Sequence, residues 1–367
     1  MDFIVKTGES LQMAIDSAHA NGGGRVVIEP GIHSSGTIYL KSFVELYLSA
    51  GAKIQGSSKV ADYDDFRDPG FDAVTPEGSR KCLIVAAHAE NIAITGSGEI
   101  NGAGPAFYDT RVPSGSFFAK PPSPRPRMIQ FYDCKKVRLE GVSFIDSPNW
   151  TFWLIACEDV NIHRITINGC QQMINNDGID IDDCRRVTVS DCFIRTGDDC
   201  LILRAIRKNP EHHALCEGVT VTNCVLDSWC QGIRVGAPSD DTIRNCSFSN
   251  LVIQGRGNGI NINNPKRYLS PGCNGYLNLY NIVFSNLVID SGRVPIWINI
   301  EEGVKLRRIG SMTFSNIRIN SNQPCKLEGS SETIIEDIRF SEIKCSKAIV
   351  VNNCHKISLN KMEIDNA

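Results

Sequence analysis

The sequence predicts an all-β fold, a single-domain right-handed parallel β-helix of about ten coils with an N-terminal capping helix. Two observations predict it. Apolar residues stand at positions 1, 3, 6 and 8 of an octet, and this octet recurs at intervals of 19 to 36 residues. A period of two broken by a two-residue step is typical of strand, bend and strand, and its recurrence is typical of stacked coils. In addition, four short phrases recur in step with the octets and fix their register.

The octets run from Val137-Leu139-Val142-Phe144 to Ile357-Leu359-Met362-Ile364. Their first residues are Val137, Val160, Val187, Val219, Cys246, Ile282, Met312, Ile338 and Ile357, which are 23, 27, 32, 27, 36, 30, 26 and 19 residues apart. Leucine-rich repeats share this period, but their Leu/Asn consensus is missing here. Unequal intervals place insertions in loops on one side of the stack, where binding grooves form.

Residues 1–56 predict an N-terminal cap and the first coils. Residues 8–21 carry apolar side chains on one helical face and end at three glycines, which predicts a helix. Strands are expected at residues 24–29, 38–48 and 51–54. A helix at this end would cover the sheet edge that a long β structure otherwise exposes.

Length and composition fit one domain over residues 1–367. Hydrophobic residues make up 42% and charged residues 22%, which argues against disorder. The net charge of -3, without any Lys/Arg run, excludes nucleic acid as an expected partner, and no apolar stretch suggests a membrane partner. Two insertions, residues 103–127 and 264–281, are long irregular loops. We expect at least one of them to wall a substrate cleft, the alternative being coil that only packs against the strands.

The fifteen cysteines form no CxxC pair and no zinc-type spacing. Cys192, Cys224, Cys246 and Cys345 stand at core positions of their octets, so we expect reduced, buried side chains, which favours a cytoplasmic protein. The N-terminus has no basic stretch followed by an apolar one, as a signal peptide would. The expectation is therefore a cytoplasmic protein, and the alternative is a secreted or periplasmic protein whose signal has been removed.

The four phrases that recur with the octets each begin with a polar residue. They are Asp177-Gly-Ile-Asp-Ile, Asp199-Cys-Leu-Ile-Leu, Gln231-Gly-Ile-Arg-Val and Asn258-Gly-Ile-Asn-Ile, and their first residues are 22, 32 and 27 apart. Because each coil adds one strand to a parallel sheet, these first residues should stack about 4.8 Å apart. This predicts that Asp177 and Asp199 are neighbours, with Asp198 just before the second strand.

Alternation along these strands predicts an outward column of side chains. Its members are Asp180, Ile202, Arg234 and Asn261, with Asp182, Arg204, Gly236 and Asn263 beside it. We therefore expect a polar, grooved sheet surface. The candidates for substrate binding are Gln231, Arg234, Asn258, Asn261, Asn263, Asp180 and Arg204. None of the seven histidines falls in the column, so neither a metal nor another cofactor is expected, and His212 and His213 are expected in an exposed loop.

Asp177, Asp198 and Asp199 suggest acid–base chemistry. Three carboxylates this close cannot all ionise freely, because like charges raise the pKa of at least one. A protonated acid and an ionised base that coexist near neutral pH are what inverting glycoside hydrolysis requires. The alternative is that these Asp and Asn residues only make turns, as they often do. Two such phrases in register on one face favour the acidic site.

Two motifs carry a resemblance to a known family. Asn176-Asp177-Gly178 and Gly197-Asp198-Asp199-Cys200, set in a β-helix of this size, resemble glycoside hydrolase family 28, the polygalacturonase and rhamnogalacturonase family. The resemblance covers most of the chain, including residues 36–41. It implies that Asp198 is the general acid and that Asp177 and Asp199 together activate the water.

Two other motifs of that family differ here. The family's Gly-His-Gly corresponds to Cys230-Gln231-Gly232, and its Arg-Ile-Lys corresponds to Asn261-Ile262-Asn263. Because two asparagines cannot supply the charge-assisted bonds that a buried carboxylate needs, we do not expect simple polygalacturonate as the substrate. Arg234 is a candidate to meet an anionic sugar instead, and the alternative is a solvated surface arginine paired with Asp180.

Together these patterns predict an inverting glycoside hydrolase that acts on a pectic or related oligosaccharide or polysaccharide, with exo action. Two alternatives stay open. One is a β-helix polysaccharide lyase, with calcium held by acidic residues and an arginine as base. The other is a non-catalytic carbohydrate-binding β-helix, which the missing histidine and basic pair would suit.

Overall fold

The computed structural model describes residues 1–71, 76–109, 111, 117–119, 121–122, 124–209, 211–269 and 277–364. Parts of the predicted insertions 103–127 and 264–281 lie outside these residues. Contacts divide the chain into two compact units. Unit 1 comprises Met1–Asp180 with Val187–Asp198, and unit 2 comprises Ile181–Arg186 with Asp199–Ala367. The prediction of one domain over the whole chain stays a prediction.

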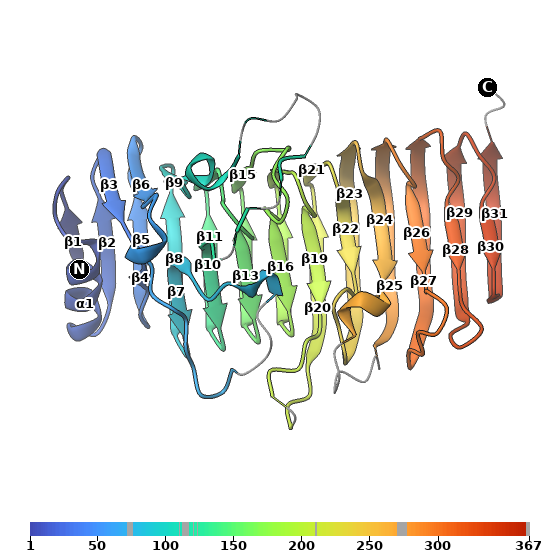
Figure 1. Ribbon diagram of the computed structural model, residues 1–367, viewed down its shortest axis with the longest axis horizontal. Helices are drawn as coiled ribbons and strands as arrows, with labels where there is room; N and C mark the ends of the chain where they lie inside the picture. Colours follow the sequence, from blue (N-terminus) through green and yellow to red (C-terminus); the bar gives the residue numbers. More distant parts are fainter. Residues whose placement is uncertain are drawn as a thin grey trace. The chain divides into compact units, whose positions relative to one another are not determined.

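Unit 1 contains one α-helix, α1 (Leu11–Ala20), and parallel strands of two sheets (Figure 1). Strands of the larger sheet are β1 (Asp2–Val5), β2 (Gly24–Ile28), β3 (Gly31–Ser35), β5 (Val44–Leu48), β6 (Ala52–Gly56), β8 (Glu90–Gly96), β9 (Glu99–Asn101), β11 (Lys135–Glu140), β12 (Ser143–Ile145), β14 (Glu158–His163), β15 (Thr166–Asn168) and β18 (Phe193–Thr196). Strands of the second sheet are β4 (Ile38–Tyr39), β7 (Cys82–Ala87), β10 (Arg127–Tyr132) and β13 (Phe152–Ile155), paired in that order. The 3-10 turns are η1 (Val60–Asp62), η2 (Pro76–Gly78) and η3 (Gly104–Phe107).

Unit 2 contains further strands of the same two sheets, all of them paired in parallel. Strands of the larger sheet are β20 (Leu215–Thr222), β21 (Val225–Ser228), β23 (Thr242–Gly255), β25 (Asn278–Ser291), β27 (Arg308–Asn320), β29 (Ile335–Cys345) and β31 (Cys354–Ile364). The second sheet pairs β19 (Leu201–Arg204), β22 (Gln231–Val235), β24 (Asn258–Asn263), β26 (Ile296–Asn299), β28 (Lys326–Glu328) and β30 (Val350–Asn352) in that order. The 3-10 turn η4 spans Lys266–Tyr268, and β16 (Ile179–Asp182) and β17 (Arg185–Ser190) contain residues of both units.

The predicted helix is confirmed as α1, which is shorter than residues 8–21. Ser10 caps its N-terminus, where its Oγ accepts a hydrogen bond from Met13 N at 3.3 Å, and the apolar face buries Leu11, Ile15 and Ala18. Figure 1 shows α1 beside β1 and β2, where it covers the first coil of unit 1. No helix among the described residues combines the length and apolar character that crossing a bilayer demands.

Two early strands match the prediction, one predicted strand is divided, and β1 and β3 were not predicted. Residues 24–29 and 51–54 form β2 and β6, whereas the single strand predicted at 38–48 is wrong: β4 and β5 are separate. The chain turns between them at Phe43, which has a φ of 67°, and no period of apolar residues signals a turn made by a phenylalanine. The edge strand β1 was not predicted, because only Val5 of its four residues is buried.

The octets form the cores of the coils, as predicted. In unit 2, Phe248, Phe284, Phe314 and Phe340 each occupy the third position of an octet, in register, and stack face to face, with ring centroids 4.8 to 4.9 Å apart. The last octet is an exception, since Leu359 is 51% exposed. Its strand, β31, pairs only with β29 among the described residues.

Left-handed residues bracket every octet. The residue before it and the residue at its fifth position both have positive φ, as at Lys136 and Gly141 in the first octet and Lys356 and Lys361 in the last. Asparagine and aspartate tolerate this conformation better than other non-glycine residues, and asparagines fill several of these positions. At the fifth position Asn286 Nδ2 donates to Asn250 Oδ1 at 3.2 Å, so the bends of successive coils are hydrogen-bonded.

The cysteines behave as small core residues. Every cysteine among the described residues is free, and Cys192, Cys224, Cys246 and Cys345 are buried as predicted. Burial raises the pKa of Cys246 to about 12, so its thiol stays protonated at neutral pH.

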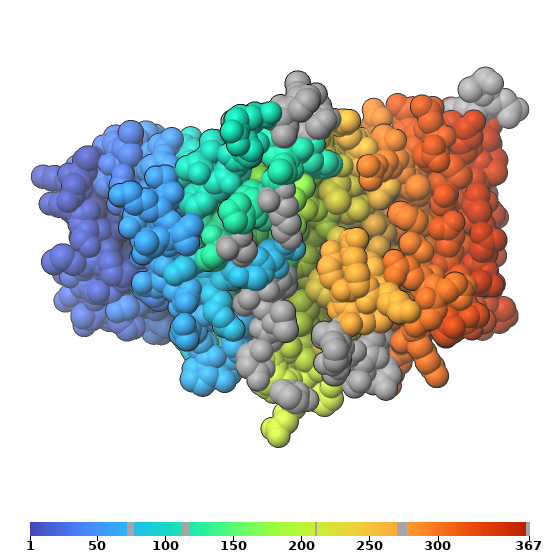
Figure 2. Space-filling view, in the orientation of Figure 1, coloured from blue at the N-terminus to red at the C-terminus, as the bar shows by residue number. Residues whose placement is uncertain are grey.

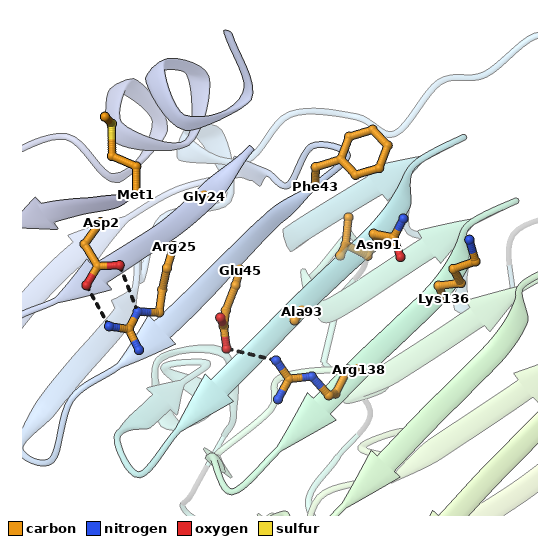
Figure 3. Close-up of a pocket in the computed structure, with 11 residues that line it drawn as sticks. Met1, Asp2, Gly24, Arg25, Phe43, Glu45, Asn91, Ala93, Lys136 and Arg138 are labelled. Carbon is orange, nitrogen blue, oxygen red and sulfur yellow. Dashed lines mark hydrogen bonds and ion pairs between the residues drawn. The ribbon is translucent and has the colours of Figure 1, made fainter. Parts of the chain in front are cut away.

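A groove of about 550 Å³ lies on the outer surface of unit 1 near the N-terminal coils (Figure 3). Its charged groups pair with one another: Arg25 Nη2 lies 2.6 Å from Asp2 Oδ2, and Arg138 Nη2 lies 3.0 Å from Glu45 Oε1. The first pair links β1 to its neighbour β2, and the second links β5 to β11 across the intervening strand β8. We therefore assign the groove a role in tying the first coils together.

His88 forms a pH-dependent clamp in unit 1. Its two ring nitrogens contact Asp133 at 2.8 Å and Asp68 at 2.7 Å, and the Asp133 contact, more than Asp68, raises the pKa of His88 despite partial burial. The clamp holds the segment that carries Phe66 and Phe71 against Tyr132.

Raising the pH should therefore weaken unit 1. A histidine whose pKa is higher in the folded than in the unfolded protein stabilises the fold. This stabilisation is fully present below the unfolded pKa of about 6.5, and it is lost as the pH rises through the folded pKa. Because His88 is half exposed, we expect a loss below about 1 kcal/mol. Thermal unfolding between about pH 6 and about pH 9 should show this loss in the wild type and not in His88→Asn, which tolerates the φ of 52°. An equal pH dependence in both proteins would contradict the clamp.

Candidate active site

Within unit 1, Asn176 of the first aspartate motif holds the turn at Gly197-Asp198, where the second motif begins. Asn176 Oδ1 accepts hydrogen bonds from Gly197 N at 2.9 Å and Asp198 N at 3.1 Å, while Asn176 Nδ2 donates to Cys170 O at 2.8 Å. The asparagine of the first motif thus shapes the second one. Both backbone donors and its own amide are satisfied, so the local geometry is strongly fixed.

Asn175, the residue before Asn176, orients the Asp198 side chain. Its Oδ2 accepts the N–H of Asn175 at 2.9 Å, and Asn175 has a φ of 61°, a conformation that asparagine tolerates. Asp198 is partly exposed, whereas Asp177 is only 3% exposed. Asp198 is therefore the more accessible of these two carboxylates in unit 1.

Gly197 leaves no room for a side chain. A Cβ at this position would overlap the backbone oxygens of Met173, Cys170 and Gln171. We expect Gly197→Ala to displace Asp198 and to lower kcat about 100-fold, since small displacements of reacting groups cost this much. Steady-state kinetics would measure it, with Gly22→Ala as a control for destabilisation away from the turn: no atom lies within 4 Å of that Cβ, but its φ of 85° strains an alanine. Unchanged kcat in Gly197→Ala would show that this turn does not position Asp198.

Arg125 is a buried arginine that the sequence did not single out. It is 2% exposed, and its guanidinium donates to Pro148 O at 2.5 Å and Asn175 Oδ1 at 3.0 Å. Burial lowers the pKa of Arg125, while the charges of Asp177 and Asp198 act in the opposite direction. Its only signal was a lone arginine between prolines in the insertion 103–127.

Asp199 lies in unit 2 and is paired with Arg234. Asp199 is 1% exposed, and Arg234 Nη1 lies 3.1 Å from its Oδ2. The alternative of a solvated surface arginine paired with Asp180 is therefore wrong, because Arg234 is only 7% exposed and pairs with Asp199. The strand register behind this placement is confirmed, since Ile202 pairs with Arg234 and Arg234 with Asn261.

Gln231 and Asn258 form a ladder of amides. Asn258 Nδ2 donates to Gln231 Oε1 at 2.8 Å, and Asn258 Oδ1 accepts the N–H of Val294 at 3.0 Å. Gln231 Nε2 also lies 3.5 Å from Cys230 Sγ. Each of these two amide oxygens thus already accepts one hydrogen bond inside unit 2.

The two asparagines that replace the family's basic residues are both buried. Asn263 Oδ1 accepts a long hydrogen bond from Arg234 Nη2 at 3.5 Å. Asn261 is 2% exposed, and its Oδ1 has no hydrogen-bond partner within the described ranges. A buried amide oxygen without a partner is costly, so Asn261 is the residue here that would gain most from a ligand hydroxyl.

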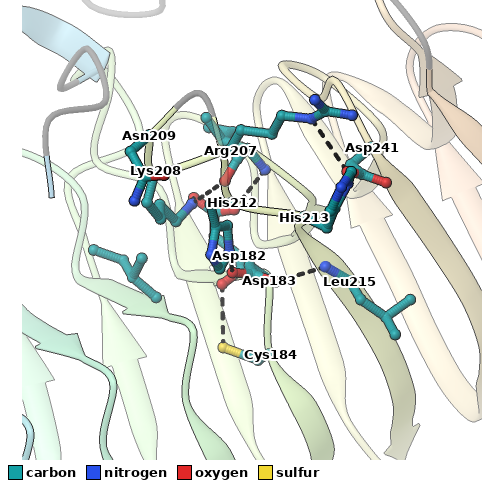
Figure 4. Close-up of polar contacts among 12 residues, drawn as sticks. Asp182, Asp183, Cys184, Arg207, Lys208, Asn209, His212, His213, Leu215 and Asp241 are labelled. Atoms are coloured by element: carbon teal, nitrogen blue, oxygen red, sulfur yellow. Dashed lines mark hydrogen bonds and ion pairs between the residues drawn. The ribbon is translucent and has the colours of Figure 1, made fainter. Parts of the chain in front are cut away.

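The expected open, polar sheet surface is wrong for the other candidates. Asp180 and Asp182 are fully buried and Arg204 is 3% exposed, with its Nε donating to Ala237 O at 3.1 Å. Asp182 pairs with the buried Lys208 at 2.7 Å (Figure 4). The reason is the segment after β19, which covers this face and which the sequence pattern does not locate.

Two consecutive aspartates anchor that covering segment in unit 2. Asp182 Oδ1 accepts the N–H of Ile206, while Asp183 accepts the N–H of Leu215 and contacts His212 (Figure 4). His212 is thus half-buried, contrary to the prediction, whereas His213 is 82% exposed as expected. Neither histidine contacts Asp199 in any interaction that the structure gives.

The predicted catalytic residues are distributed over both units. Asp177 and Asp198 belong to unit 1 and Asp199 to unit 2, and a peptide bond joins Asp198 to Asp199. Of the predicted binding residues, the structure groups Arg234, Asn261 and Asn263 with Asp199 in unit 2. The orange segment that carries η4 projects over β22 and β24 of that unit (Figures 1 and 2), and the Tyr268 ring covers the Arg234 guanidinium at 5.7 Å.

Comparison with known proteins gives a consistent family. The chain is 28% identical over 227 residues to a probable polygalacturonase of Arabidopsis thaliana, covering 61% of this chain and 44% of that protein. It is 23% identical to an endo-polygalacturonase of Pectobacterium carotovorum, covering 84% of this chain and 76% of that protein. Other plant relatives are also matched over only about half their length, 50 to 51%.

The fold agrees with a solved structure. A hyperthermoactive exopolygalacturonase of Thermotoga maritima superimposes with a TM-score of 0.82 at 21% identity, over 99% of this chain and 92% of that one. The fold is the predicted right-handed parallel β-helix. The model of the glycosyl hydrolases family 28 matches residues 66–366, which leaves residues 36–41 of the predicted resemblance outside the match. This chain therefore belongs to glycosyl hydrolase family 28.

Proposed function

We propose that this chain is an inverting glycoside hydrolase that cleaves O-glycosidic bonds in a pectic or related oligosaccharide or polysaccharide. Asp198 protonates the leaving oxygen, and Asp177 and Asp199 activate the attacking water. The observation that carries the proposal is that a member of family 28 keeps all three aspartates in the motifs Asn176-Asp177-Gly178 and Gly197-Asp198-Asp199. The hydrolysis needs no metal or other cofactor, since the acid and the base are both side chains.

Accessibility supports the role of Asp198 as acid. A general acid must come within hydrogen-bond reach of the oxygen that it protonates. Asp198 is the partly exposed aspartate, and its Oδ2 is held by Asn175 N.

The ion pair supports the role of Asp199 as base. A base must be ionised before it can take a proton from water, and a guanidinium at 3.1 Å favours the charged carboxylate. Burial alone would favour the neutral acid. We assign Asp177 to the same task on the strength of its motif.

The substrate that we propose is not simple polygalacturonate. The positions of the family's Arg and Lys are the neutral amides Asn261 and Asn263, and Arg234, which contacts Asn263, is already paired with Asp199. Amides recognise hydroxyl groups better than carboxylates, which prefer charge-assisted donors. We therefore propose a sugar with hydroxyl groups at this subsite. Exo action is part of the proposal, and curated relatives named as exopolygalacturonases and as an endo-polygalacturonase show that product analysis must decide it.

Release of reducing sugar from a panel of pectic and neutral oligosaccharides tests the proposal. We expect hydrolysis of at least one mixed pectic oligosaccharide at a rate well above that of polygalacturonate, with single terminal residues released. An unsaturated product that absorbs in the ultraviolet, lost on adding a chelator, would make the protein a lyase. Binding without cleavage of every member would make it a carbohydrate-binding protein.

A further inference from the structure

Arg234 is a buried cation whose position calls for a function. It projects from β22, is 7% exposed, and lies with Nη1 3.1 Å from Asp199 Oδ2. Charges this deeply buried destabilise a fold unless they are paired with good geometry. Asp199 supplies the partner for Nη1, whereas the buried Nε has no hydrogen-bond partner among the described residues, and the two residues form one electrostatic unit.

The surroundings of Arg234 hold its guanidinium against Asp199. Nη2 donates to Asn263 Oδ1 from the next strand, and the Tyr268 ring of η4 covers it at 5.7 Å, a distance typical of a cation–π contact. The thiol of Cys230 also faces it from the residue before β22. Although burial lowers the pKa of Arg234, the charge of Asp199 raises it above the ordinary value. Among these neighbours, only Asp199 is a carboxylate.

The neutral Gln231 makes the ion pair of Arg234 with Asp199 important for the charge at the site. It stands where the family's third motif has histidine, and its amide is bound to Asn258 and lies against Cys230. An amide does not titrate and carries no charge, so this position cannot influence the ionisation of a neighbouring carboxylate as an imidazolium would. Arg234, three residues further along the same strand, supplies a permanent positive charge to unit 2 at Asp199.

We propose that Arg234 is a positioning residue for Asp199: it keeps this carboxylate ionised and oriented, and it is thereby withdrawn from substrate. This rests on the proposed function. It also separates two tasks that the sequence alone left together on Arg234, contact with an anionic sugar and contact with an aspartate. The pair commits Arg234 to the second task.

The pH dependence of kcat/KM in Arg234→Gln and Arg234→Lys tests this. Loss of a neighbouring guanidinium shifts an aspartate pKa by about 1 to 3 units. The acidic limb should therefore move up by about 1 to 3 pH units in Arg234→Gln and much less in Arg234→Lys, which keeps the charge. Arg244→Gln is the control, because it removes a more exposed ion pair of the same unit, in which Arg244 Nε on β23 lies 2.8 Å from Glu217 Oε2 on β20, and it should leave the limb in place. A raised KM with an unmoved limb would overturn the proposal, since it would make Arg234 a substrate contact.

A second measurement works without any substrate. Arg234→Gln removes the guanidinium that pairs with the buried Asp199, so the thermal midpoint of the variant at neutral pH should fall, and adding Asp199→Asn in the double variant should restore most of that loss. Equal and additive losses in the single and double variants would overturn the pairing. If no oligosaccharide is hydrolysed while the double variant still restores stability, the proposed function fails and the ionised pair stands.

Discussion

Replacing Asp198 with asparagine should lower kcat by about 100- to 10,000-fold, which is the usual contribution of a general acid or base. The change removes only the proton that the acid delivers. The amide oxygen of asparagine can still accept the N–H of Asn175, and the backbone N–H of residue 198 still donates to Asn176. The folded structure should therefore be retained, and steady-state kinetics with the best oligosaccharide would measure the loss directly.

Asp159→Asn is the matched control for this experiment. Asp159 lies on β14 of the same unit, is exposed, and has a φ of 58°, which asparagine also tolerates. Its replacement should leave kcat unchanged. The kcat of Asp177→Asn and of Asp199→Asn should fall by about the same factor as the kcat of Asp198→Asn. Full activity in any of these three variants would remove that residue from the catalytic set.

The largest effect on stability should come from the phenylalanine stack. Phe284 is fully buried between Phe248 and Phe314, with ring centroids 4.8 and 4.9 Å away. Phe284→Ala should lower the free energy of unfolding by about 3 to 5 kcal/mol, because it opens a cavity that rigid coils cannot close. Denaturant unfolding would measure the loss in the first transition, since stacked coils need not unfold in one step.

Val283→Ala provides the comparison on the same strand. Val283 is the preceding residue and is 36% exposed, so its truncation should cost less than about 1 kcal/mol. The difference between the two losses of unfolding free energy separates the contribution of packing inside the coil from the contribution of strand propensity. Similar losses in both would mean that the stack contributes little beyond the strand propensity of its residues.

The coils could be predicted from the sequence because their rules are local. Apolar residues at positions 1, 3, 6 and 8 face inward, and the left-handed bends that set this step favour the asparagines and glycines found there, such as Asn250, Asn286 and Gly141. The prediction of one strand over 38–48 was wrong because the bend at Phe43 does not follow this rule: phenylalanine rarely adopts a positive φ.

The site was only partly predictable. Alternation correctly placed Arg234 opposite Ile202 and Asn261, since register follows from the repeat. Burial of Asp182 and Arg204 could not be predicted, because it depends on a covering segment whose path follows no period. The pairing of Arg234 with Asp199 is likewise a matter of side-chain reach, which a pattern of residue types does not encode.

The central claim is hydrolysis with inversion by the three aspartates, and the most direct measurement is ¹H NMR of the first product formed from a cleaved oligosaccharide. A water that attacks from the face opposite the leaving group gives a new reducing end of inverted configuration, before mutarotation mixes the anomers. We predict the inverted anomer at early times with the wild type. An initial product of retained configuration would contradict the account, since it would require a covalent intermediate on one of these carboxylates.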